Sequence, residues 1–132
     1  MAVETVNEAT SNEQVAVGFL RLVAVDGRPR DAFAKYVAPT FRHHDPSCGG
    51  APEDLLAAME ADAQANPRKS LDVKRVLTEN DLVAVHSHVV RWQGDPGFAL
   101  VHLFRVRQGK IVELWSVGQP VPVTTPNPNG MF

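Results

Sequence analysis

The 132-residue sequence has one cysteine, no long apolar run and no excess of either charge, and each scarcity excludes a class of protein. A single cysteine, Cys48, cannot form an intrachain disulfide or a cysteine-based zinc cluster. Charged residues or histidines interrupt the apolar stretches well before the ~18 residues that a membrane span requires. Thirteen lysines and arginines stand against fifteen aspartates and glutamates, so the basic surface that nucleic acid needs is missing.

The beginning of the sequence also lacks the features of an export signal. Residues 1–14 carry three glutamates and no apolar core, which argues against a secretory leader. The composition, 44% apolar and 21% charged, is typical of a folded globular domain. We therefore expect one small soluble domain in the cytoplasm, with no nucleic-acid or membrane partner.

Helical signals dominate the first half of the chain. Ser11, followed three residues later by Gln14, matches the capping box that begins many helices. Apolar residues then recur at helical spacing, which predicts a helix over residues 12–25. Similar signals predict a short second helix capped by Asp31 and a third that begins at Pro52 and ends near residue 65.

The second half has the alternation of β-strands. The predicted strands are Ser70–Thr78, Leu82–Trp92, Phe98–Arg107 and Lys110–Val117. Helices followed by an antiparallel meander are typical of the α+β class, in which helices cover one face of a curved sheet and a ligand cavity can form between them. The proline-rich residues 120–132 show no periodicity and are expected to form a strap or an unstructured end.

Histidine is the side chain best suited to acid–base chemistry near neutral pH. In the strand Phe98–Arg107 the even positions are apolar except for His102, so strand geometry places this imidazole among core or pocket side chains. There it could act as an acid or a base, or it could be a buried histidine that makes one hydrogen bond. The strand pattern alone leaves both interpretations open.

Two further clusters allow a functional and a structural interpretation. His86 and His88 share a strand face and could bind a divalent metal if His44 converged on them, but a polar stripe on the solvated side of the sheet or at an interface is favoured, and we expect no metal. Asp45 precedes a proline that restricts its backbone. Beside apolar walls its pKa would rise and it could take a proton from a carbon acid; otherwise it forms an Asx turn.

Several segments, taken in order, resemble a known family. They are Phe41–Pro46, Asp81–His88, Leu103–Trp115, Gln119–Pro120 and Asn129–Phe132. Over nearly the whole chain from Val15 they resemble the SnoaL-like branch of the nuclear transport factor 2-like superfamily. The resemblance implies a cone of one strongly curved antiparallel sheet closed by three helices, with an internal pocket and dimerisation through the sheet. The domain would span residues 12–119, between a flexible N-terminus (1–11) and a proline-rich strap (120–132).

The resemblance also implies a chemistry. Members near the type protein cyclise polyketides by an aldol condensation through an enolate, without a cofactor, whereas some relatives only bind ligands. Asp45 matches the proton-abstracting aspartate of the related ketosteroid isomerases, and His102 occupies the strand position of the acidic base in the cyclases. The family's Glu-His-Trp-Asp is represented here by residues 113–116, which lack the His and the Asp, and Phe19 stands near the place of an isomerase tyrosine.

These considerations predict a cofactor-independent enzyme acting on an apolar carbonyl-containing small molecule. Asp45 would remove a proton α to the carbonyl, His102 (protonated or neutral) would donate to the enolate oxygen, and His44 would orient either group. The pocket would also be lined by Phe19, His86, Phe104 and Trp115. The alternative is a non-catalytic binding domain with the same pocket. A homodimer is expected because apolar residues lie on both faces of the sheet.

Overall fold

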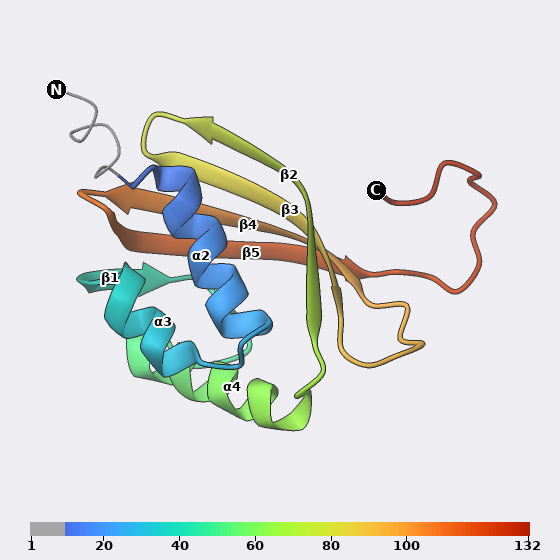
Figure 1. The fold of residues 1–132 in the computed structure, drawn as a ribbon, viewed down its shortest axis with the longest axis horizontal. Helices are drawn as coiled ribbons and strands as arrows, with labels where there is room; N and C mark the ends of the chain where they lie inside the picture. Colours follow the sequence, from blue (N-terminus) through green and yellow to red (C-terminus); the bar gives the residue numbers. More distant parts are fainter. Residues whose placement is uncertain (1–9) are drawn as a thin grey trace, which may run out of the picture.

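The computed structural model describes residues 10–132, in which three helices precede most of a five-stranded sheet (Figure 1). The predicted flexible segment 1–11 lies almost entirely outside the described residues. The elements are α2 (Asn12–Ala24), α3 (Pro29–Tyr36), β1 (Val37–His43), α4 (Pro52–Ala65), β2 (Ser70–Glu79), β3 (Leu82–Val90), β4 (Phe98–Arg107) and β5 (Lys110–Pro120). No described helix is both long and apolar enough to span a membrane.

The five strands form one open, curved sheet in the order β1-β5-β4-β3-β2. The strand β1 runs parallel to β5, and the other neighbours are antiparallel. In Figure 1 the sheet curves around α2, with α3 and α4 below it. This arrangement confirms the predicted α+β class and the predicted cone, in which one curved sheet is covered by three helices.

Local sequence signals explain most of the element boundaries. The capping box is formed, since the backbone N–H of Gln14 donates to Ser11 Oγ at 3.1 Å and the N–H of Ser11 donates to Gln14 Oε1 at 3.0 Å. The β4–β5 hairpin turns through Gln108 and Gly109, both with positive φ, as a tight turn of this hand requires. The strand β3 ends at Val90, earlier than predicted, because the chain then enters a turn.

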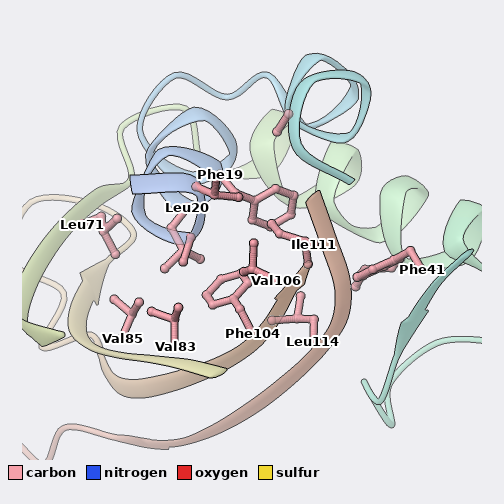
Figure 2. Close-up of a cluster of buried hydrophobic side chains, with 14 of the residues drawn as sticks. Phe19, Leu20, Phe41, Leu71, Val83, Val85, Phe104, Val106, Ile111 and Leu114 are labelled. Carbon is pink, nitrogen blue, oxygen red and sulfur yellow. The ribbon is translucent and has the colours of Figure 1, made fainter. Parts of the chain in front are cut away.

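The concave face of the sheet packs on α2 to form the core (Figure 2). Phe19 from α2 meets Phe104 from β4 edge-to-face, with ring centroids 6.0 Å apart, and both side chains are fully buried. Aromatic pairs of this geometry stabilise a core beyond the area that they bury. The inner sheet residues around them are Val83, Val85, Val106, Ile111 and Leu114.

The proline-rich segment after β5 turns back towards the convex side of the sheet (Figure 1). Its last residue, Phe132, stacks on His88 with ring centroids 4.5 Å apart and on His86 at 5.7 Å. The ammonium of Lys74 lies 5.2 Å from the same aromatic ring. The end of the chain therefore covers part of the outer face of β2 and β3.

Candidate functional site

A cavity of about 300 Å³ lies between the concave face of the sheet, α2, α4 and the loop after β1. This volume is at the lower end of the range for small-molecule sites. Its apolar wall is formed by Leu20, Val23, Ala24, Leu55, Ala58, Met59, Leu71, Val89, Leu100 and Leu114. Its polar residues are His43, Asp45, Ser47, Asp62, Lys69, His102 and Ser116.

His102 lies on the inner face of β4, as the strand alternation predicts, and contributes to the cavity wall. Its Nδ1 is buried and has no hydrogen-bond partner among the described residues, which leaves Nε2 as the ring nitrogen that can meet a ligand. Burial removes the ring from water and lowers the pKa of His102 to about 4. The imidazole is therefore neutral at neutral pH.

Asp45 lines the cavity and also forms the Asx turn that was its structural alternative. Its Oδ1 accepts the backbone N–H of Ser47 at 2.8 Å and the Ser47 hydroxyl at 2.6 Å. These hydrogen bonds lower the pKa of Asp45 below its usual value, because they stabilise the carboxylate more than partial burial destabilises it. Of the two alternatives for Asp45, the structure therefore has the turn and not the raised pKa, and Asp45 is ionised at neutral pH.

His43 is a cavity residue that the sequence interpretation missed. Its side chain is buried, its Nδ1 accepts the backbone N–H of Asp45 at 3.2 Å, and its Nε2–H donates to the carbonyl of Ala51 at 3.1 Å. Because both ring nitrogens are used, the orientation of the His43 ring is fixed, and it ties the Asp45 loop to the start of α4. The sequence does contain a signal for this position, because His43 lies two residues after the apolar Phe41 and therefore on the same, inner face of β1.

His44, predicted to orient the catalytic groups, points to the opposite side of the sheet. Its Nε2 lies 2.7 Å from Glu113 Oε2, and its ring stacks on Trp115 at 5.1 Å with planes 3° apart. Successive side chains in an extended chain point to opposite faces, so His44 points outward because His43 points inward. Trp115, predicted to line the pocket, is likewise an outer residue, between Leu114 and Ser116 that line the cavity.

The other three residues predicted to line the pocket also lie outside the cavity wall. Phe19 and Phe104 are packed in the core, where their rings contact each other (Figure 2). His86 is on the outer face, beside Arg75 and Phe132. Within residues 10–132 no three His, Cys, Asp or Glu side chains are grouped to hold a metal ion.

The strand β4 and the loop after β1 bring His102 and Asp45 to the same cavity. His102 of β4 pairs with Ser116 of β5, and His43 of β1 pairs with Leu114 of β5. Asp45 lies in the loop two residues beyond the end of β1, where it lines the cavity together with Ser116 and His102. A small ligand between Asp45 and His102 can contact both side chains.

The buried imidazole predicts a particular dependence of stability on pH. The unfolded chain binds a proton to His102 near pH 6.5, whereas the folded chain binds it only near pH 4. As pH falls between these values, the free energy of unfolding should decrease by on the order of 2–3 kcal/mol through this residue. Urea denaturation at several pH values would measure this loss, and His102→Leu should abolish it. If the free energy of unfolding of His102→Leu falls by the same amount over this pH range, His102 is not the cause of the loss.

The comparisons with known proteins agree with this architecture. The chain belongs to the SnoaL-like domain family, whose sequence profile matches residues 16–114. No curated protein has a matching sequence.

Solved structures with the same fold share little sequence with this chain. AclR, a candidate hydroxylase from Streptomyces galilaeus, is 21% identical with a TM-score of 0.67, covering 82% of this chain and 88% of its own. A candidate SnoaL-like polyketide cyclase from Jannaschia sp. CCS1 is 19% identical (TM-score 0.67, coverage 85% and 91%). A candidate polyketide cyclase from Bacillus cereus ATCC 10987 is 20% identical (TM-score 0.71, coverage 86% and 77%). Because the sequence identities are this low, the similarity to these structures shows a shared fold and nothing about activity.

Proposed function

We propose that the protein is a cofactor-independent enzyme of cyclase or isomerase type, which acts on an apolar carbonyl-containing small molecule through an enolate. One observation carries the proposal: a carboxylate that is ionised and an imidazole that is neutral line the same mostly apolar cavity. Two titratable groups with different environments in one cavity are the usual basis of acid–base catalysis.

In the proposed mechanism Asp45 is the base and His102 the hydrogen-bond donor. The Oδ2 of Asp45 receives no hydrogen bond from Ser47 and would take the α proton, so that the C–H electron pair becomes the enolate. An orphaned buried N–H is rarer in proteins than an unpaired acceptor, so the proton of His102 is placed on Nε2. The Nε2–H would then donate to the developing oxyanion, an interaction worth ~10²–10³ in rate.

The low pKa of Asp45 restricts the substrate that this base can serve. A carboxylate with a lowered pKa is a weak base, so the carbon acid has to be unusually acidic. A carbon between two carbonyl groups meets this condition, because the enolate charge is shared by two oxygens. We therefore propose a 1,3-dicarbonyl compound. The enolate either attacks a second carbonyl carbon of the same molecule, forming a ring whose new alkoxide takes the proton from Asp45, or takes that proton back from Asp45 at another position. Asp45 is ionised again in both cases.

The second candidate function is ligand binding without turnover. It is favoured by the Asx turn, which accounts for Asp45 without any catalytic role. The two functions differ in one measurement: only the enzyme exchanges the α proton of a bound 1,3-dicarbonyl compound with solvent faster than buffer does. Comparison of the wild type with Asp45→Asn in this assay tests the proposal.

We also propose that two copies of the chain associate through the convex face of the sheet. Leu77, Leu103 and Val117 are exposed there, at positions opposite to the cavity residues of their strands. An apolar patch of this kind is typical of an interface. We expect sedimentation at high micromolar concentration to give a dimer, and Val117→Glu to shift it towards monomer. Val123→Glu, on the exposed C-terminal segment, is the matched control, and a monomeric wild type would contradict the proposal.

A further inference from the structure

An ion pair forms a second polar region of the cavity, away from Asp45 and His102. Lys69, just before β2, and Asp62 of α4 both line the cavity, and their side chains are paired. The Lys69 side chain is 14% exposed, whereas that of Asp62 is 44% exposed. Asp62 also accepts a hydrogen bond from Asn66 Nδ2 at 2.8 Å. Lys69 is therefore the more buried member of the pair.

The register separates this ion pair from the proposed catalytic groups. Leu71, two residues after Lys69, pairs with Val89, while His102 pairs with Val85 of the same strand. Four residues of a strand span about 13 Å. Leu71, Val89 and Leu100 line the cavity over this interval. The cavity thus has a carboxylate and an imidazole in one region, an apolar middle, and a mostly buried ammonium in the other.

The burial and charge of these groups determine which charged ligand the cavity favours. A buried ammonium needs a partner, whereas a half-exposed carboxylate can be solvated when its partner is taken. An anion on the ligand can therefore replace Asp62 at Lys69, while Asp62 keeps water and the amide of Asn66. The opposite region repels anions because Asp45 is ionised. A ligand with one anionic group is thus oriented with that group at Lys69.

We propose that the substrate is a keto acid, whose carboxylate binds Lys69 and whose reacting carbonyl lies between Asp45 and His102. This inference rests on the proposed function for the reacting carbonyl at one end of the substrate, and it adds a carboxylate at the other end. Lys69 would then be the residue that selects acids over neutral carbonyl compounds.

The test compares two probes that differ only in charge. We use 6-acetyl-2-naphthoate and 6-acetyl-2-naphthamide, which have the same apolar body with a ketone at one end. The wild type should bind the carboxylate at least about tenfold more tightly than the amide, as expected when a charge-assisted hydrogen bond replaces a neutral one. Titration followed by naphthalene fluorescence gives both Kd values. Equal affinities, or no binding of the carboxylate, would overturn the proposal.

Variants identify the residue responsible for the preference. Lys69→Met should remove it, and Lys69→Arg should keep most of it because the charge remains. Arg68→Met removes the same charge from the exposed neighbouring position and should leave the preference unchanged. Asp62→Asn should strengthen carboxylate binding by removing the competing anion. A preference that survives in Lys69→Met would show that another cation selects the ligand.

The binding measurement separates this inference from the proposed catalysis. Asp45→Asn should lose proton exchange but keep the preference for the carboxylate, since Lys69 is unchanged. If the wild type shows no proton exchange but prefers the carboxylate probe in a Lys69-dependent way, the protein binds acids without turning them over. If exchange is present but the preference is absent, the catalytic proposal stands and the keto acid is wrong.

Discussion

Asp45→Asn is expected to lower turnover of a 1,3-dicarbonyl substrate by ~10²-fold or more, with little change in ligand affinity. The amide has nearly the shape of the carboxylate and its oxygen can still accept the hydrogen bonds of Ser47, but it cannot take a proton. Deuterium uptake at the α carbon of 2-acetyl-1-tetralone, measured by mass spectrometry against buffer, reports the proton abstraction directly.

Two controls decide how the result for Asp45→Asn is interpreted. Asp26→Asn removes one charge from an exposed position outside the cavity wall and should leave the exchange rate unchanged. Ser47→Ala removes one donor to Asp45 and should raise the pKa of its carboxyl towards the usual value, so the acid limb of the pH–rate profile should move to higher pH. If the α proton still exchanges in Asp45→Asn, Asp45 is not the base and serves only in the turn.

The sequence predicted the fold better than it predicted the site. The class followed from patterns that are local, such as the Ser11 capping box and the period-2 alternation that put His102 on the inner face of β4. For β1 the local sequence predicts only a short extended piece, Thr40–His44, because its pairing partner, β5, lies some 70 residues later in the chain and local sequence cannot show it. Long-range pairing depends on tertiary packing rather than on local propensity.

Within the site, the errors came from strand alternation and turn chemistry that the sequence did contain. Phe41 and His43 alternate towards the core, which leaves His44 outside, and Ser47 follows Asp45 at the spacing of an Asx turn. In contrast, Asp62 and Lys69 come together only because the end of α4 reaches the start of β2. Neither residue stands in a pattern that would have indicated a ligand site.

The pH–rate profile tests which form of His102 acts as donor. Above about pH 6 Asp45 is ionised and His102 is neutral, because both pKa values lie well below that pH. We therefore expect the exchange rate to stay level between about pH 6 and 9, and to fall only in acid as both groups take protons. A rate that instead declines as the pH rises through the pKa of His102, about 4, would mean that the imidazolium is the donor.

His102→Leu should have opposite effects on stability and on activity. The leucine replaces an imidazole whose buried Nδ1 has no partner within residues 10–132, so the free energy of unfolding at pH 7 should rise by about 1–2 kcal/mol. The same change removes the proposed donor to the enolate oxygen and should lower the exchange rate by ~10²–10³-fold. Urea denaturation and deuterium uptake measure the two effects on one sample. Increased stability with unchanged exchange would show that His102 is only a wall residue of the cavity. The enolate would then need another donor, such as Ser116, which pairs with His102 and also lines the cavity.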